Sequence, residues 1–376
     1  MPLQDDSIGS ALIYGAGSIG NHLSHAARTL GWQVTVCDVD PRALRRMREE
    51  IYPGRYGDWD AGIRQTLVAD LGPADVFDCV IVGTPPDSHM AVALEGIARA
   101  RKALLIEKPL ATPSLAGCAA LMERLTRFTG RAFVGYDHVV GTAAVRVLEL
   151  LRQGIVGEIK TIDVEFREHW GGIFNAHPWL AGPWDSYLGF SRRGGGAAGE
   201  HSHALNLWQH LAHAAGAGRV RAVSAACQWV RDGRVDYDEV CAMTLRTESG
   251  MIGRVVQDVV SVPVTKRASV QGTDGRLEWV CGLEPGVDAV RVRGAGGAVD
   301  EERIAKTRPD DFLAELRAIQ DCCRGGRAGD GILIERGFDT QLVLAAALRS
   351  AETGGQVTVV YSGDYGPAAL DAEASA

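Results

Sequence analysis

The first third of the chain alternates continuously apolar runs with segments whose apolar residues have helical spacing. Short apolar runs cover Ala11–Tyr14, Val34–Cys37, residues 76–82 and residues 102–106, and helical segments separate them. Strands that are apolar throughout and are joined by helices indicate a parallel sheet with helices on both faces. We therefore predict an α/β domain over residues 1–137.

The pattern changes after this region. A helical segment is followed by β-rich runs of alternating character, which glycine or charged turns separate without intervening helices. These runs are residues 158–170, 219–230, 237–250, 251–262, 267–280 and 289–294. Successive strands indicate an antiparallel sheet with one covered face. We predict a second, α+β domain over residues 138–364, followed by a frayed tail over residues 365–376.

Composition narrows the class of protein. A chain of 376 residues is too long for one ordinary core, which agrees with two domains. The net charge of -8 argues against nucleic acid or an anionic membrane as a partner. No apolar run reaches the roughly 18 residues that a membrane span needs. The N-terminus lacks signal-peptide features and the 8 cysteines lack metal-site spacing, so we expect a cytoplasmic protein with reduced thiols.

A glycine motif follows the first apolar run. It reads Gly15-x-Gly17-x-x-Gly20, with a strand before it and a helix after it. This context is typical of a dinucleotide-binding turn, although an unrelated α/β turn would look similar. Gly15 would permit the tight turn, Gly17 the approach of a pyrophosphate, and Gly20 close packing of helix on strand. The free N–H groups at the helix start, near Ser18 and Ile19, would face the phosphates.

Asp38 lies at the end of the second apolar run, about twenty residues after the glycine turn. A carboxylate there accepts hydrogen bonds from ribose hydroxyls and repels a 2′-phosphate, which favours NAD over NADP. Arg42 lies one helical turn further on and would weaken that preference, unless it is an ordinary surface residue of the first helical turn. Thr84–Pro85 and Lys108 follow later strands, at the carboxyl edge where such sheets bind ligands.

Four motifs, "YGAGSIG", "VGTPPDSH", "IEKPLA" and "GGG…EHSH", occur in a characteristic order and spacing. In this respect the chain resembles the glucose–fructose oxidoreductase / inositol dehydrogenase (Gfo/Idh/MocA) family over nearly its whole length. The resemblance implies a Rossmann domain, a second domain with a large, open, mostly antiparallel sheet, and a nicotinamide between them. It adds Glu107 and His89 to the expected cofactor contacts. It also implies homodimers or homotetramers that form through the second sheet.

The resemblance also implies catalytic roles. Lys108 would polarise a substrate oxygen, although a lysine at a strand end can simply be solvated. His203 would accept the proton of a substrate hydroxyl. The usual acid would fall at Gly199, so we expect Glu200 to replace it, because residues three apart share a helix face. Alternatively, Glu200 only complements the helix dipole.

The other histidines near this motif have weaker claims. His201 is expected to point to another face or, alternatively, to touch a ligand from the loop side. His210 and His213 are expected to lie on the outer, polar side of the helix. His201-x-His203 with Glu200 lacks the spacing of a metal site, so we expect no bound metal. A nearby loop with His169, His177 and Asp185 keeps that alternative open.

That loop, residues 167–196, is rich in Trp, His and Gly. Trp170 and Trp184 would stack on a sugar face, and Asn175 and His177 would bind its hydroxyls. Arg192 would meet a carboxylate or phosphate of the substrate. The alternative is an interface loop, because tryptophans are enriched at interfaces too.

These features lead to one favoured function. We expect an NAD-dependent oxidoreductase that acts on a secondary hydroxyl or ketone of a sugar, sugar derivative or cyclitol. Two alternatives remain: an NAD-using hydrolase or lyase with transient oxidation, and a dinucleotide-binding protein without catalysis. The family usually has an arginine where this chain has Val139, so one substrate contact is open to question.

Overall fold

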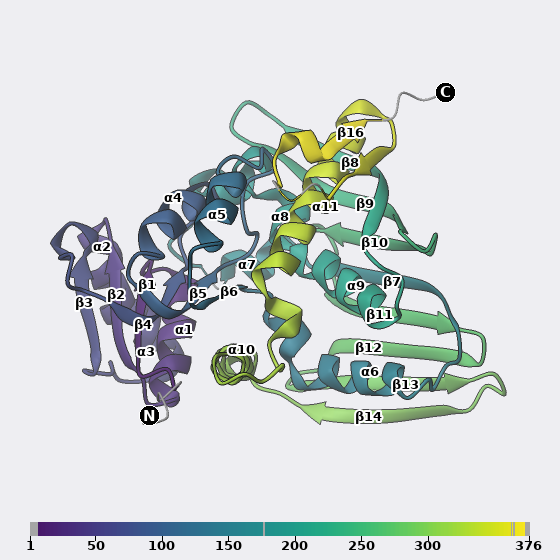
Figure 1. Cartoon of the computed structure of the whole chain (residues 1–376), viewed down its shortest axis with the longest axis horizontal. Coiled ribbons are helices and arrows are strands. Elements are labelled where there is room, and N and C mark those ends of the chain that lie inside the picture. The colour runs from purple at the N-terminus through teal and green to yellow at the C-terminus, as the bar shows by residue number, and fades with distance from the viewer. Residues whose placement is uncertain (1–6, 176, 362, 364, 373–376) are drawn as a thin grey trace.

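The computed structural model describes residues 7–175, 177–361, 363 and 365–372. It contains a six-stranded sheet near the N-terminus and a ten-stranded sheet in the rest of the chain (Figure 1). The predicted combination of a Rossmann α/β domain with an α+β domain is thereby confirmed. None of the described helices is long and apolar enough to cross a membrane.

The six-stranded sheet is parallel throughout, with the strand order β3-β2-β1-β4-β5-β6. Its strands are β1 (Ser10–Tyr14), β2 (Gln33–Asp38), β3 (Ile63–Leu67), β4 (Phe77–Val82), β5 (Ala100–Ile106) and β6 (Arg131–Val134). Its helices are α1 (Ser18–Thr29), α2 (Pro41–Arg46), α3 (Tyr52–Tyr56), α4 (Pro86–Gly96) and α5 (Cys118–Leu125), with a π-helical turn at Met47–Ile51. Ala11, Leu12 and Ile13 have no exposed surface, which explains the unbroken apolar run of β1.

The ten-stranded sheet has the order β14-β13-β12-β11-β7-β10-β9-β8-β15-β16. Its strands are β7 (Ile159–Arg167), β8 (Val220–Arg231), β9 (Asp236–Thr247), β10 (Ile252–Asp258), β11 (Thr265–Gly272), β12 (Gly275–Glu284), β13 (Val287–Gly294), β14 (Val299–Ala305), β15 (Val357–Val359) and β16 (Leu370–Ala372). Of its described pairings, that of β7 with β10 is parallel and the others are antiparallel.

Helices cover one face of this sheet. They are α6 (Thr142–Arg152), α9 (Ser202–Ala214) and α11 (Ile334–Thr353), and Figure 1 shows all three in front of the strands. Alternate residues of β7, such as Ile162 and Val164, are buried beneath them. The other face is polar, and there Arg254 and Asp163 form an ion pair at 2.6 Å. The alternation of apolar and polar residues in the sequence therefore reflects a sheet that helices cover on one face.

Helix α10 (Arg308–Cys323) connects the two domains. It comes from the second half of the chain, yet it packs against α1, β5 and β6 of the first domain (Figure 1). The rings of Phe312 and His22 stack at 4.7 Å across this contact. The first domain is therefore completed by a helix that lies far away in the sequence.

The expected frayed tail differs from the structure. Strand β16 pairs with β15, and the buried Tyr365 donates a hydrogen bond to Asp339 at 3.1 Å. Tyr365 also stacks on Phe338. Residues 365–372 therefore belong to the second domain, and residues 373–376 lie outside the described part of the chain.

The remaining short helices lie in loops. They are α7 (Trp170–Asn175), α8 (Gly196–Glu200) and 3-10 turns at Val68–Asp70, Asp137–Val140 (η3), Pro183–Asp185, Tyr187–Gly189, Ser191–Arg193, Asp330–Ile332 and Pro367–Ala369.

The glycine turn yields a matched pair of variants. A Cβ at Gly20 would overlap the carbonyl oxygen of Gly15, whereas a Cβ at Gly17 would meet no atom of the described chain within 4 Å. We expect Gly20→Ala to lower the free energy of unfolding by about 1–3 kcal/mol, because the helix must move away from the strand. Gly17→Ala should leave it nearly unchanged. Urea unfolding of both variants measures this difference, and equal stabilities would contradict it.

Candidate active site

A cavity of about 720 Å³ lies between the two domains. One wall consists of the carboxyl edge of the parallel sheet, and the other consists of β7, β11 and the segment from Gly172 to His203. Helix α10 closes one side with Arg308, Phe312 and Glu315. This is the edge at which parallel α/β sheets bind ligands.

Most of the expected cofactor residues line this cavity. Gly17, Ser18 and Ile19 do so at the start of α1, Thr84 and Pro85 after β4, and Glu107 and Lys108 after β5. Among the described residues, no side chain caps the start of α1 and no acid lies in its first turn. Its N–H groups can therefore hold a pyrophosphate.

Other expected cofactor residues shape the turns. Gly15 has a φ of 102°, and a Cβ there would lie 2.6 Å from the carbonyl oxygen of Gly83, so no other residue fits easily. The carboxylate of Asp38 accepts hydrogen bonds from the N–H groups of Ala16 at 2.8 Å and Asp40 at 2.9 Å. Asp38 is thereby fixed at the end of β2, and Arg42 bonds Asp40 instead of facing it.

His89 has a structural position that its expected role did not foresee. Its ring is fully buried, with Nε2 2.7 Å from the carbonyl oxygen of Thr84 and Nδ1 3.0 Å from that of Pro109. The side chain lies behind the cavity wall and holds together the two turns that follow β4 and β5. It therefore supports the turns after β4 and β5 from behind.

Lys108 and Glu200 contact each other across the cavity. The ammonium of Lys108 donates to the carbonyl oxygen of Glu200 at 2.9 Å and to its carboxylate at 3.2 Å. Both side chains are more than four-fifths buried. Such a charged, partly desolvated pair fixes the direction of the lysine.

The predicted pairing of Glu200 with His203 does not form. Helix α8 ends at Glu200, and α9 begins at Ser202, because His201 leaves the helical conformation with φ −95° and ψ 22°. The rule that residues three apart share a helix face fails across this break. His201 also lines the cavity instead of pointing away from it.

The acid that faces His203 is Asp137, which the sequence did not reveal. Asp137 Oδ1 lies 3.6 Å from His203 Nδ1 and 3.8 Å from His138 Nδ1. The ring of Tyr136 meets that of His203 edge-on at 5.5 Å. Burial, followed by the charges of His138 and Lys108, lowers the pKa of His203 well below its usual range. His203 is therefore a neutral imidazole at neutral pH, which is the form that accepts a proton.

Two further carboxyl groups lie at the same end of the cavity. Burial, and then the charge of Asp137, raises the pKa of Glu107 to about 8. Burial, and then Glu107 and Asp137, raises the pKa of Glu315 well above its usual range. Neither oxygen of Glu315 has a hydrogen-bond partner among the described residues. The sequence could not place Glu315 here, because α10 lies about 200 residues after Glu107.

Of the loop residues expected to bind substrate, His177 lines the cavity. Trp179 lines it as well, and its ring also lies 5.3 Å from the guanidinium of Arg46. The opposite wall adds Lys266 and Glu168, an ion pair at 2.7 Å that the sequence did not suggest.

Four expected substrate residues lie away from the cavity wall. Trp170 is buried in a small core with Phe174 and Tyr237, which leaves no ring face for a ligand. Trp184 is 42% exposed, and the guanidinium of Arg234 lies 4.1 Å from its ring. Asn175 and Arg192 are exposed. In an irregular loop, packing decides which residues are buried and which are exposed. The sequence of such a loop has no periodic pattern from which this could be predicted.

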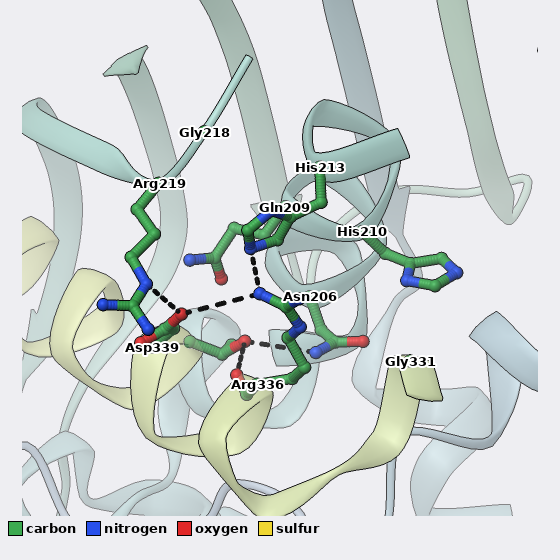
Figure 2. Close-up of a pocket in the computed structure, with 10 residues that line it drawn as sticks. Asn206, Gln209, His210, His213, Gly218, Arg219, Gly331, Arg336 and Asp339 are labelled. Atoms are coloured by element: carbon green, nitrogen blue, oxygen red, sulfur yellow. Dashed lines mark hydrogen bonds and ion pairs between the residues drawn. The ribbon is translucent and has the colours of Figure 1, made fainter. Parts of the chain in front are cut away.

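The expected outer position of His210 and His213 is wrong. His213 faces α11 and His210 lies beside Gly331, and both residues line a second, small pocket (Figure 2). There Arg219 pairs with Asp339 at 3.2 Å, Arg336 contacts His213, and Asn206 donates to Thr340 at 3.1 Å. The free volume of about 10 Å³ holds at most one water molecule. This cluster therefore fastens α9 to α11 and offers no room for a substrate.

The glycine turn at the carboxyl edge of a parallel sheet is typical of an NAD-binding Rossmann domain. The chain belongs to the Gfo/Idh/MocA oxidoreductase family. Residues 10–136 match its NAD-binding Rossmann domain, and residues 144–278 match a GFO/IDH/MocA C-terminal domain. No curated protein sequence matches the chain significantly.

Several solved structures share the whole fold. An oxidoreductase from Agrobacterium radiobacter, in complex with NAD+, L-tartaric acid and magnesium, has a TM-score of 0.73 at 20% identity over 94% of this chain and 98% of its own. An aldose–aldose oxidoreductase from Caulobacter crescentus with glycerol has the same score and identity over 94% and 100%. A putative myo-inositol dehydrogenase from Sinorhizobium meliloti scores 0.69 at 18% identity over 93% and 99%.

The raised pKa of Glu107 predicts a pH-dependent stability. Between its ordinary value of 4.5 and about 8, the unfolded chain loses the Glu107 proton while the folded chain keeps it. The free energy of unfolding should therefore fall with rising pH across this window, by on the order of a few kcal/mol.

Glu107→Gln should remove most of that fall, since a neutral amide has no proton to lose. Urea unfolding at pH 5 and pH 9 measures the difference, and the same change at the exposed Glu123 serves as the control. A slope that Glu107→Gln leaves unaltered would show that this group ionises freely.

Proposed function

We propose that the protein is an NAD-dependent oxidoreductase that interconverts a secondary hydroxyl and a ketone of a sugar, sugar derivative or cyclitol. One observation carries the proposal: Lys108 and His203 line the same cavity as the glycine turn of α1. A polarising cation and a proton acceptor thus lie beside a dinucleotide-binding turn.

The residues fit a bound NAD. The start of α1 would hold its pyrophosphate, the turns after β4 and β5 its nicotinamide end, and Asp38 its adenosine ribose. When bound, NAD supplies the acceptor for a hydride. Asp38 favours NAD because its carboxylate repels a 2′-phosphate.

Different side chains of the cavity bind the substrate oxygen and accept its proton. Lys108, fixed by Glu200, donates a hydrogen bond to the substrate oxygen and stabilises negative charge on it. His203 accepts the hydroxyl proton on its neutral ring. Asp137 faces the other side of the imidazole and stabilises the imidazolium that forms.

Polar groups around the cavity suit a polyhydroxylated substrate. His177, Ser186 and Tyr187 line it, and the pair of Lys266 and Glu168 adds both charges. The neighbouring structures with L-tartaric acid and glycerol hold molecules of this kind. We place the enzyme in the cytoplasm as a homodimer or homotetramer that forms through the polar face of the ten-stranded sheet.

A screen of sugars, cyclitols and sugar derivatives with NAD, followed by the absorbance of reduced nicotinamide, tests the proposal. With the best substrate, Lys108→Met and His203→Gln should each lower kcat by roughly 10²–10⁴-fold. His169→Gln, at an exposed histidine, should turn over normally. Unchanged turnover in the first two variants would refute the assigned roles.

Cofactor choice offers a separate test. Asp38→Ala should raise kcat/KM with NADP relative to NAD by about tenfold or more, because a like charge no longer faces the 2′-phosphate. Asn in place of the exposed Asp58 is the control and should leave the ratio unchanged. If Asp38→Ala and the native protein have the same ratio of kcat/KM with NADP to kcat/KM with NAD, Asp38 does not face the 2′ position of the cofactor ribose.

A further inference from the structure

Three metal-binding atoms meet at one point of the cavity wall. Asp137 Oδ1, His138 Nδ1 and His203 Nδ1 all lie within 4.8 Å of one another. All three atoms are shielded from solvent, and none has a hydrogen-bond partner among the described residues. Buried polar atoms without partners are uncommon and costly, and three of them together point to a missing common partner.

The separations fit an ion better than they fit direct contacts. Asp137 Oδ1 lies 3.6 and 3.8 Å from the two imidazole nitrogens. These gaps are too long for hydrogen bonds and too short for a water molecule between the atoms. Ligands of a tetrahedral zinc ion, about 2.0–2.1 Å from the metal, lie about 3.3 Å apart. A shift of Asp137 by a few tenths of an ångström would therefore bring its Oδ1 to the separation from each imidazole nitrogen that ligands of a tetrahedral ion have.

The local backbone presents the three side chains together. Asp137 and His138 are neighbours in the η3 turn, and His203 lies in the first turn of α9. Asp311, the other acid near His138, lies 3.7 Å from its Nδ1 but is held by Lys306 at 2.7 Å. Asp311 is thus engaged, and Asp137 remains the carboxylate ligand.

The surrounding charges favour a cation. The two lysines that face the cavity are each paired with an acid, Lys108 with Glu200 and Lys266 with Glu168. Among the ion pairs of the described residues, Asp137 contacts His138 and His203 but no lysine or arginine. A dication beside Asp137 would give this buried carboxylate a countercharge.

We propose that Asp137, His138 and His203 bind a divalent transition-metal ion, and that the bound ion inhibits the oxidoreductase. Two imidazoles and one carboxylate suit Zn²⁺ and its neighbours better than Mg²⁺ or Ca²⁺. A metal on His203 Nδ1 leaves the proton of the neutral ring on Nε2. The ring then has no free nitrogen for a substrate proton, so metal binding and base catalysis exclude each other.

Metal binding is tested without any turnover. The full-length protein, freed of metal by a chelator, is titrated with Co²⁺ while its visible d–d absorption is recorded, and with Zn²⁺ by calorimetry. We expect one ion per chain, and a dissociation constant at least tenfold weaker in His138→Ala and in His138→Asn. His177→Ala is the matched control, because this histidine lines the same cavity but its Nδ1 bonds the carbonyl oxygen of Ile173 at 2.7 Å.

Thermal unfolding guards against misfolded variants. Zn²⁺ should raise the Tm of the native protein and of His177→Ala, and at the same Zn²⁺ concentration it should raise the Tm of a folded His138 variant by clearly less. No stoichiometric binding, or equal affinity in the His138 variants, would overturn the site.

The second part of the proposal, inhibition by the bound ion, rests on the proposed function and is measured separately from metal binding. With an active substrate, Zn²⁺ should lower the rate, a chelator should restore it, and His138→Ala should need at least tenfold more Zn²⁺ for the same effect. A rate that rises with Zn²⁺ would overturn this second part while the titration still decides the site. If the protein turns over no polyol, the proposed function is wrong, but the metal titration still tests whether the site binds a metal ion.

Discussion

The contact between Lys108 and Glu200 is the interaction on which the cavity depends. Lys108 follows β5 of the parallel domain, and Glu200 ends α8 of the second domain, so the pair joins the two walls. The lysine bonds the backbone as well as the carboxylate of Glu200, and its direction is therefore set by the course of the chain at that point. Any change in how the domains meet would move the ammonium group.

The chain breaks its helix immediately after that contact. Glu200 turns toward Lys108, and the next helix starts afresh and presents His203 to Asp137. One continuous helix would place Glu200 and His203 on the same side, where they would engage each other. The break therefore gives Lys108 and His203 separate acidic partners. This separation allows one site to hold a charged lysine and a neutral histidine.

The parts of the site that could be predicted from the sequence are those formed by residues that are close together in the chain. A strand, a glycine turn and a helix start are neighbours in the chain, so Gly17, Ser18 and Ile19 could be assigned from their spacing. The ends of β4 and β5 were predictable for the same reason. Asp137, Glu315 and Lys266 come from a turn, a late helix and a distant strand, and only the packing of the domains brings them together. The loop tryptophans show the same limit, because composition does not tell which rings are buried.

Helix α10 also has a consequence for how the protein is synthesised and folded. A ribosome completes all six strands of the parallel sheet before it has translated the residues that cover α1 and supply Glu315. Until then the apolar face that Phe312, Leu316 and Ile319 will occupy is open. The newly made first domain thus exposes an apolar surface and an incomplete cavity while the ribosome translates about half of the chain. The nucleotide-binding half is first in the sequence, but it is among the last parts of the molecule to be finished.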